Sequence, residues 1–275
     1  MTAPTIGFIG AGRIGAAMVE RLLAAGRRVR LYARRPEVRD RLAVLGAEPV
    51  DRIRDIAAAD VVVSCLFGDD QISTLLPEVV EAMAEGTVLL SHTTGTPEVL
   101  RSLDRFAPTG RAAVVDATFS GTPEAVRAGE LVVFLGGAPD HVASARQVVE
   151  CYAGTVIETG GRGSALRVKL INNLLFAAVS QLTLQGLTLG RGVGIDEGVM
   201  LEALAISSGG STAGRYIADR GGSESFAAAV ASFLQKDVAA CRAALTDSGV
   251  DFSGLLGAAC GGPIDIGDTA LKEGT

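Results

Sequence analysis

The sequence predicts an α/β fold, with a doubly wound parallel sheet followed by an all-α carboxyl-terminal domain, from the order of its segments. Short β-branched runs alternate with helical patterns in the first part of the chain, which is typical of βαβ units. After about Gly163 the strand-like runs stop, and helical segments rich in Ala and Leu continue. We therefore expect two domains, at residues 1–162 and 163–275.

The predicted strands are mostly apolar through their length, as expected where helices cover both faces of a sheet. They are Thr5–Ile9, Arg28–Tyr32, Val61–Cys65, Val88–Leu90, Ala112–Val115, Leu131–Leu135 and Thr155–Ile157. A long helix is expected from Ser164, as its N-cap, to about Gly190. Because this helix is apolar nearly all round, we expect it to be buried on most sides, between two domains or two subunits. A homodimer or homotetramer is therefore expected.

The composition indicates a globular cytoplasmic protein. With 48% hydrophobic residues, the 275-residue chain can bury a sizeable core. The net charge of -6 forms no block and the basic residues form no stripe, so we expect no nucleic-acid partner. The start lacks a basic n-region, and the apolar stretch Leu170–Leu189 contains many amide and hydroxyl side chains, so neither export nor a membrane span is expected. The cysteines lack CxxC spacing and only two histidines occur, so we expect reduced thiols and no metal site.

The segment from Ile6 to Ala25 predicts a dinucleotide-binding turn between a strand and a helix. Its Gly-x-Gly-x-x-Gly motif consists of Gly10, Ala11, Gly12, Arg13, Ile14 and Gly15. Gly10 permits the tight turn, Gly12 lets the backbone approach a pyrophosphate, and Gly15 lets the helix pack on the strand. The helix N-terminus supplies N–H groups and partial positive charge. A glycine-rich turn without a ligand is the weaker alternative, because the motif follows the first strand of an alternating chain. The sequence thus predicts a Rossmann domain that binds NAD(P).

The end of the second predicted strand favours NADP(H) over NAD(H). NAD enzymes usually have an acidic residue there to bind the ribose hydroxyls. This chain has Ala33 at that position, followed by Arg34 and Arg35. Two guanidinium groups would bind a 2′-phosphate through charge-assisted hydrogen bonds, and one could stack on the adenine. The alternative is two solvated surface arginines, and NAD(H) stays possible.

The tetrapeptide Gly-Thr-Pro-Glu occurs at Gly95–Glu98 and again at Gly121–Glu124. Each copy predicts a helix start, with Thr as the cap, Pro at the first helical position and Glu in the first turn. Both are expected after the carboxyl ends of parallel strands, where open α/β sheets bind ligands, and a helix N-terminus there suits a substrate carboxylate. The alternative is that both are simply good caps.

The long helix contains Lys169 and Asn173, which are four residues apart and so share one helix face. Apolar surroundings favour a neutral amine, which would let Lys169 exchange a proton, while Asn173 orients the lysine or a substrate oxygen. The alternative is a lysine that reaches water, with asparagines that bond across an interface. Spacing alone does not choose between these interpretations.

With these residues in view, the chain resembles the β-hydroxyacid dehydrogenase family, which includes 3-hydroxyisobutyrate dehydrogenase, tartronate semialdehyde reductase and, more distantly, 6-phosphogluconate dehydrogenase. Gly7–Gly15 matches the family's opening motif. Its substrate-loop motif, Asp-Ala-Pro-Val-Ser-Gly-Gly, is similar to Asp116–Thr122 but differs at Thr118, Phe119 and Thr122. The most specific match is Gly161–Asn173, which resembles the family's catalytic motif.

The resemblance implies a role for each candidate residue. Lys169 exchanges a proton with the reacting oxygen, and Asn173 holds that oxygen. Ser120, Gly121 and Thr122 bind the substrate carboxylate. Leu66, Phe67 and Thr94 lie near the nicotinamide and its ribose. Lys236, in Phe233–Asp237, resembles the family's Lys-Asp motif and approaches the cofactor and substrate from the second domain, although a solvated helix lysine is the alternative.

The function expected from these features is NADP(H)-preferring interconversion of a small β-hydroxyacid and its semialdehyde or keto acid. A hydroxyisobutyrate-like acid, tartronate semialdehyde, succinic semialdehyde or a bulkier anion all remain compatible. Two alternatives are an imine reductase of the same architecture, which commonly replaces the catalytic lysine, and an NADP(H)-binding module without turnover. Lys169 argues against the first, and Lys169, Asn173, Ser120 and Lys236 together argue against the second.

Overall fold

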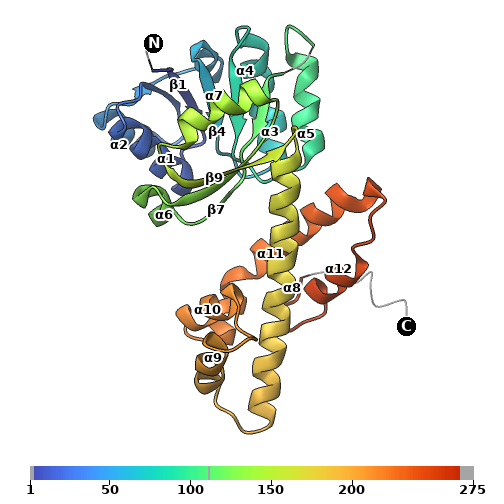
Figure 1. The fold of residues 1–275 in the computed structure, drawn as a ribbon. Coiled ribbons are helices and arrows are strands. Elements are labelled where there is room, and N and C mark those ends of the chain that lie inside the picture. The colour runs from blue at the N-terminus through green and yellow to red at the C-terminus, as the bar shows by residue number, and fades with distance from the viewer. Residues whose placement is uncertain (1–2, 111, 267–275) are drawn as a thin grey trace. The chain divides into compact units, whose positions relative to one another are not determined.

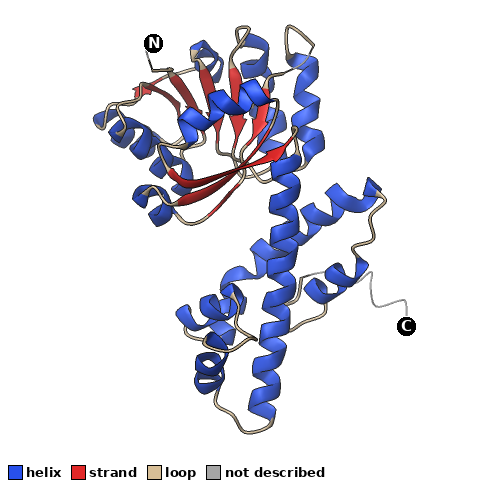
Figure 2. Cartoon of the chain, in the orientation of Figure 1, coloured by secondary structure: helices blue, strands red, loops and turns tan. Residues whose placement is uncertain are grey.

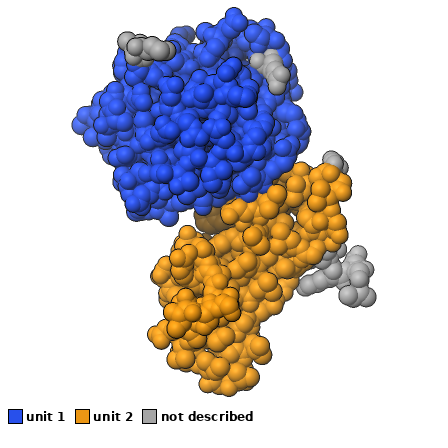
Figure 3. Space-filling model, viewed as in Figure 1, with its two compact units in different colours: residues 1–169 blue, residues 170–275 orange. Residues whose placement is uncertain are grey.

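The computed structural model describes residues 3–110 and 112–266, which divide into two compact units after Lys169 (Figure 3). The first unit contains a sheet with helices, and the second is helical (Figures 1 and 2). The predicted fold class, a mostly parallel Rossmann-like sheet followed by an all-helical domain, is confirmed. The long helix α8, Ser164–Gly192, belongs to both units, because the division after Lys169 falls within it.

The sheet of the described residues runs in the order β3-β2-β1-β4-β5-β6-β8-β7, with β9 paired to β8. Its strands are β1 Ile6–Ile9, β2 Val29–Tyr32, β3 Glu48–Pro49, β4 Val61–Ser64, β5 Val88–Ser91, β6 Val114–Asp116, β7 Phe119–Ser120, β8 Leu131–Gly136 and β9 Ala153–Gly160. Strands β1 to β6 are parallel, but β8 is antiparallel to β6 and β7. The expectation of a wholly parallel sheet was therefore wrong at β8, because the chain returns through β7 and a short helix rather than through a crossover helix. Strand β9 is largely exposed, so helices do not cover it on both faces.

Helices cover both faces of the sheet and enclose two hydrophobic cores. They are α1 Arg13–Ala24, α2 Pro36–Val44, η1 Ile53–Ala58, α3 Asp69–Leu75, α4 Pro77–Ala82, α5 Pro97–Ser102, η2 Leu103–Phe106, α6 Pro123–Ala128 and α7 Pro139–Val149. One core contains Met18 and Leu22 of α1 with Val148 of α7, and the other contains Ile56 of η1 and Val80 of α4. Alternate residues of each central strand enter opposite cores, which explains why these strands are apolar throughout.

The second unit packs α9 Glu197–Ala205, α10 Thr212–Asp219, α11 Ser223–Leu245, η3 Thr246–Ser248 and α12 Ser253–Cys260 with α8. Leu174, Leu184 and Leu187 of α8 lie in its core beside Ile217 and Phe226. By length and composition α8 could cross a membrane, but its buried Gln181 hydrogen-bonds to the backbone of Ala259 and Ile264. These contacts indicate a core helix of a globular domain.

One side of α8 is not buried, contrary to the prediction. Ile171, Leu175, Leu182 and Leu189 have exposed fractions of 47%, 51%, 54% and 70%. Within one chain this helix is therefore half-covered, and only the alternative of a second subunit remains to cover these side chains. Ser164 was also wrongly predicted as the N-cap: it is the first helical residue, and the carboxylate of Asp116 accepts the hydrogen bonds from Gly163 N and Leu166 N.

Candidate active site

The glycine loop after β1 has the geometry that a dinucleotide requires. Gly10 has φ +93°, and a Cβ there would lie 2.3 Å from the Cys65 carbonyl oxygen. A Cβ on Gly15 would lie 2.2 Å from the Gly10 carbonyl oxygen, so α1 packs closely on the turn. A Cβ on Gly12 would meet nothing within 4 Å. The backbone at Gly12 thus faces open space that a pyrophosphate can approach, with Arg13 and Ile14 in the first turn of α1. The residues present fit this group.

The two predicted 2′-phosphate ligands follow β2 and are exposed. Arg35 reaches back to the glycine loop, where its Nη2 donates to the Ala11 carbonyl oxygen across 3.3 Å. Ala33 packs partly buried against the core, so it leaves no carboxylate at the position that binds ribose hydroxyls in NAD enzymes. Guanidinium groups and a glycine loop therefore lie together at this end of the sheet.

The loops after β4 and β5 lie at the same edge as the glycine loop, because Ile9 is in register with Ser64, and Ser64 with Ser91. Leu66 is half-buried and its N–H donates to Thr93 Oγ1, whereas Phe67 is 68% exposed. Thr94 is half-buried in the next loop. The hydroxyls of Ser64 and Ser91 are buried and have no hydrogen-bond partner among the described residues. Buried hydroxyls normally have one, which indicates that a water or ligand atom reaches this edge.

The first Gly-Thr-Pro-Glu copy begins α5, but Thr96 does not cap it as predicted. Its N–H and its hydroxyl both donate to the Asp69 carboxylate, at 3.0 Å and 2.8 Å. A Cβ on Gly95 would lie 1.9 Å from Asp69 Oδ1. Asp69 of α3 thus supplies the carboxylate at this helix start, a role that nothing in its local sequence indicates.

The predicted substrate loop is exposed and lies between β7 and α6. Ser120 and Gly121 are exposed, and Gly121 has φ +139° with a Cβ position 2.8 Å from Leu131 Cδ1, so glycine is required there. Thr122 caps α6, because its Oγ1 accepts a hydrogen bond from Ala125 N. The strand before this copy is β7, which runs antiparallel to β8, so the expectation that both copies follow parallel strands was wrong here.

Two departures from the family motif have structural roles. Thr118 is fully buried, and its hydroxyl donates to the Ala165 carbonyl oxygen of α8 across 2.8 Å. Phe119 packs against the core, with its ring edge-on to His92 at 5.9 Å. A proline at position 118 could not donate this hydrogen bond. These two side chains therefore fix the strand end rather than line the exposed loop.

The predicted proton-transfer residues fall in both units. Lys169 is half-buried and ends the first unit, one turn beyond the residues that bond Asp116 and Thr118. Asn173 is buried in the second unit, where its Nδ2 donates to Asp237 Oδ2 across 2.9 Å and its Oδ1 accepts from Asn172. Lys236, half-buried on α11, precedes Asp237 in the chain. The structure thus brings Asn173 to the Lys-Asp motif, and it adds Asp237, which sequence reasoning quoted but did not assign.

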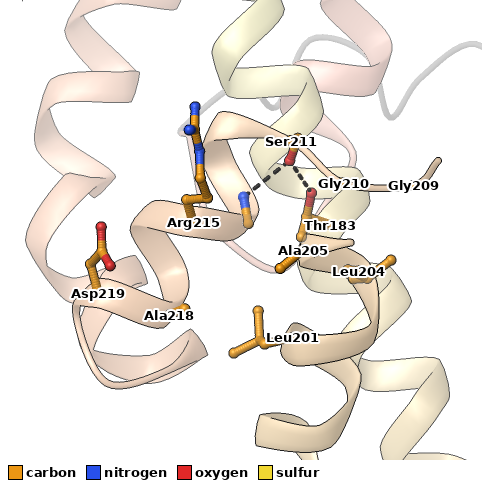
Figure 4. Close-up of a pocket in the computed structure, with 11 residues that line it drawn as sticks. Thr183, Leu201, Leu204, Ala205, Gly209, Gly210, Ser211, Arg215, Ala218 and Asp219 are labelled. Carbon is orange, nitrogen blue, oxygen red and sulfur yellow. Dashed lines mark hydrogen bonds between the residues drawn. The ribbon is translucent and has the colours of Figure 1, made fainter. Parts of the chain in front are cut away.

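Two surface pockets lie elsewhere, and none of the predicted site residues lines them. One, of about 150 Å³, lies among α8, α9 and α10, with Leu201 and Leu204 on its wall and Ser211 bonded to Thr183 and to the Gly214 N–H (Figure 4). The other, of about 650 Å³, lies between the ends of β8 and β9 and the start of β6, and includes Gly137 and Arg162. The second pocket is at the amino edge of the parallel strands, opposite the glycine loop.

Comparison with known proteins agrees with this division of roles. Residues 5–161 match the NAD-binding domain of 6-phosphogluconate dehydrogenase, and residues 163–261 match the NAD-binding domain of NADP-dependent 3-hydroxyisobutyrate dehydrogenase. A 3-hydroxyisobutyrate dehydrogenase and an NAD-dependent L-serine dehydrogenase of Pseudomonas aeruginosa are each 30% identical over 212 residues, which cover 76% of this chain and 71% of the relative.

A solved structure shows the same fold over nearly the whole chain. The 3-hydroxyisobutyrate dehydrogenase of Mycobacterium tuberculosis, solved with L-serine, superposes with a TM-score of 0.82 at 22% identity, covering 96% of this chain and 97% of that one. The glycine loop and both matched domains lead to one conclusion: this chain is an NAD(P)-binding oxidoreductase that belongs to the 3-hydroxyisobutyrate dehydrogenase-like family of β-hydroxyacid dehydrogenases.

Proposed function

We propose that this protein interconverts a small β-hydroxyacid and its semialdehyde or keto acid, with NADP(H) preferred and Lys169 as general acid and base. One observation carries the proposal: the first unit alone combines the glycine loop, the exposed Ser120–Thr122 loop and Lys169 at the anchored start of α8. Nicotinamide, when bound, supplies or accepts the hydride. The relatives named for 3-hydroxyisobutyrate and L-serine both act on acids with a hydroxyl group β to the carboxylate.

The chain's own groups have separable tasks. Ser120 Oγ–H and the Gly121 N–H bind and orient the substrate carboxylate, as donors on an exposed loop. In reduction, Lys169 Nζ gives a proton to the carbonyl oxygen while the carbonyl carbon gains hydride. In oxidation, the neutral amine takes the hydroxyl proton. Asn173 orients the reacting oxygen, and Lys236 adds a cation for the anionic ligands. Proton, hydride and substrate charge balance in both directions.

The exposed side of α8 supports a second proposal, that two copies of the chain associate through it. Ile171, Leu175, Leu182 and Leu189 stand 4, 7 and 7 residues apart, which is the heptad spacing of a helix-pairing seam. A two-fold axis near the middle of the helix would place each such side chain against one of the partner's.

The test is absorbance at the reduced-nicotinamide band, with NADPH and NADH against L-serine, 3-hydroxyisobutyrate, their semialdehydes and cyclic imines. Wild type should turn over the carboxylate compounds. Lys169→Ala should lose about 10²- to 10⁴-fold in kcat while the Kd for NADPH changes little, because a dinucleotide does not need the amine. Arg167→Ala, an exposed change on the same helix, should keep activity. Turnover of imines alone, or full activity in Lys169→Ala, would refute the assignment.

A further inference from the structure

The end of β6 holds the start of α8 through a buried carboxylate. Asp116 has an exposed fraction of 0%, and it accepts hydrogen bonds from Gly163 N at 2.6 Å and Leu166 N at 2.9 Å. These N–H groups belong to the helix end that lacks intrahelical partners, where the macrodipole also favours negative charge. One side chain of the sheet thus satisfies both a charge preference and two donors of α8.

A second contact fixes the same turn from the opposite polarity. The Thr118 hydroxyl donates to the Ala165 carbonyl oxygen across 2.8 Å. A Cβ on Gly136 of β8 would lie 2.6 Å from Ser164 Oγ and 2.8 Å from Asp116 Oδ1, so the backbone of β8 also closes on this turn. Thr159 of β9 bonds Ser164 through their hydroxyls at 2.6 Å. Residues 163–166 are therefore held by β6, the strand that follows it, β8 and β9.

A buried carboxylate is a costly way to cap a helix. Desolvation raises the pKa of Asp116, and this outweighs the backbone hydrogen bonds that lower it. An exposed Asp does the same job at lower cost at the start of α9, where Asp196 accepts from Gly198 N and Val199 N. The difference between these two helix starts is what the first helix carries, because Lys169 follows Leu166 by less than one turn.

We infer that Asp116 is the positioning residue for Lys169, with Thr118 fixing the rotation of the helix turn that bears the lysine. Each residue of an α-helix advances the rotation by about 100°, so a slip of one residue at residues 163–166 would swing Lys169 away from its place. The Lys169 side chain also points back over the turn that Asp116 and Thr118 grip, since Cα–Cβ bonds tilt toward the helix N-terminus. This inference rests on the proposed role of Lys169.

Kinetics of four variants test it. Asp116→Asn should lower kcat by about 30-fold or more, with the Kd for NADPH changed by less than about threefold, because misplacement of a proton donor costs rate rather than cofactor binding. Its solvent deuterium isotope effect should rise, whereas loss of folded protein would leave that effect unchanged. Thr118→Val should lower kcat by about tenfold and Thr118→Ser should restore it. Asp196→Asn, which weakens the α9 cap, should stay within about twofold of wild type. Equal losses in Asp116→Asn and Asp196→Asn, or an unchanged isotope effect, would overturn the inference.

A second readout does not need turnover. The chain has three lysines, Lys169, Lys236 and Lys272, so ¹³C reductive methylation gives a countable set of dimethyl-lysine NMR signals, which Lys169→Arg assigns. In folded Asp116→Asn, the Lys169 signal should shift while the Lys236 signal stays. An unmoved Lys169 signal would overturn the inference whatever the activity. If wild type reduces none of the carboxylate compounds, the proposed function fails, and the NMR signal still decides whether Asp116 positions Lys169.

Discussion

The Tyr152 hydroxyl donates a hydrogen bond to His92 Nε2 across 2.8 Å in the core of the first unit. The other ring nitrogen, Nδ1, lies 2.5 Å from the Ala117 carbonyl oxygen, which can only accept, so Nδ1 carries the proton. Both side chains are buried, and burial lowers the pKa of His92 to about 4, against a smaller opposing effect of the Ala117 bond. A neutral imidazole therefore ties β5 to the residue between Asp116 and Thr118.

This pair predicts a loss of stability in mild acid. In the unfolded chain the imidazole binds a proton near pH 6.5, whereas in the native chain it does so only near pH 4. The unfolded state therefore gains protons first as the pH falls, and the stabilisation that is complete above pH 6.5 is lost toward pH 4. The linkage amounts to about 2 kcal/mol between pH 7 and pH 5.

Urea unfolding at these two pH values measures that loss. His92→Gln should flatten the difference by about 2 kcal/mol, and His141→Gln, at the second histidine of the chain, should keep the wild-type difference. A His92→Gln protein with the wild-type pH dependence would show that the buried imidazole is not the group responsible.

The exposed arginines after β2 predict the cofactor preference. Replacing Arg34 and Arg35 together with Ala should raise the KM for NADPH by about tenfold to hundredfold, because charge-assisted hydrogen bonds to the 2′-phosphate are lost. The KM for NADH should change little. Arg54→Ala, on η1, removes an equally exposed cation away from the glycine loop and serves as the control. Equal effects on both cofactors would instead place the arginines on the shared pyrophosphate, which is consistent with the bond from Arg35 to Ala11.

Much of the first unit follows from local sequence. The central strands are predictable because they are apolar on both faces, and the glycine loop because Gly10 and Gly15 are each needed by their immediate neighbours. The two-residue strands β3 and β7 could not be predicted, since so few residues show no periodicity. The reversal of β8 depends on pairing with β7 across a short helix, which no strand pattern records.

The candidate site was predictable where a motif is contiguous and not where it is assembled by the fold. Lys169 and Asn173 share one helix, so their spacing is visible in the sequence. Asp116 bonds a residue 47 positions away, and Asp69 bonds one 27 positions away, so their capping roles appear only once the sheet edge has formed. Thr118 differs from the family motif in a way that suggested altered substrate contacts, yet its burial and its bond to Ala165 give it a structural role.

The Arg162–Asp104 pair predicts a stabilising contact next to α8. Arg162 Nη1 and Nη2 donate to the two carboxylate oxygens at 2.9 Å and 2.6 Å, with side-chain exposures of 17% and 29%. Arg162→Ala should lower the free energy of unfolding by about 2 kcal/mol, since it leaves a partly buried carboxylate without its cation. Arg162→Lys should recover only part, because a lysine cannot form both parallel bonds. Arg101→Ala breaks an exposed pair with Glu98, so urea unfolding should register less than about 0.5 kcal/mol there.

The exposed apolar seam of α8 predicts the association state. Leu182 is 54% exposed, so an acidic side chain there disturbs little within one chain, but it would place two like charges in an apolar interface between copies. Light scattering coupled to gel filtration should give twice the chain mass for wild type and the single-chain mass for Leu182→Asp. Val44→Asp, at a position 88% exposed on α2, should leave the wild-type mass unchanged. If wild type elutes as a monomer at micromolar concentration, or if Val44→Asp dissociates it equally, α8 is not the pairing surface and its exposed leucines face solvent.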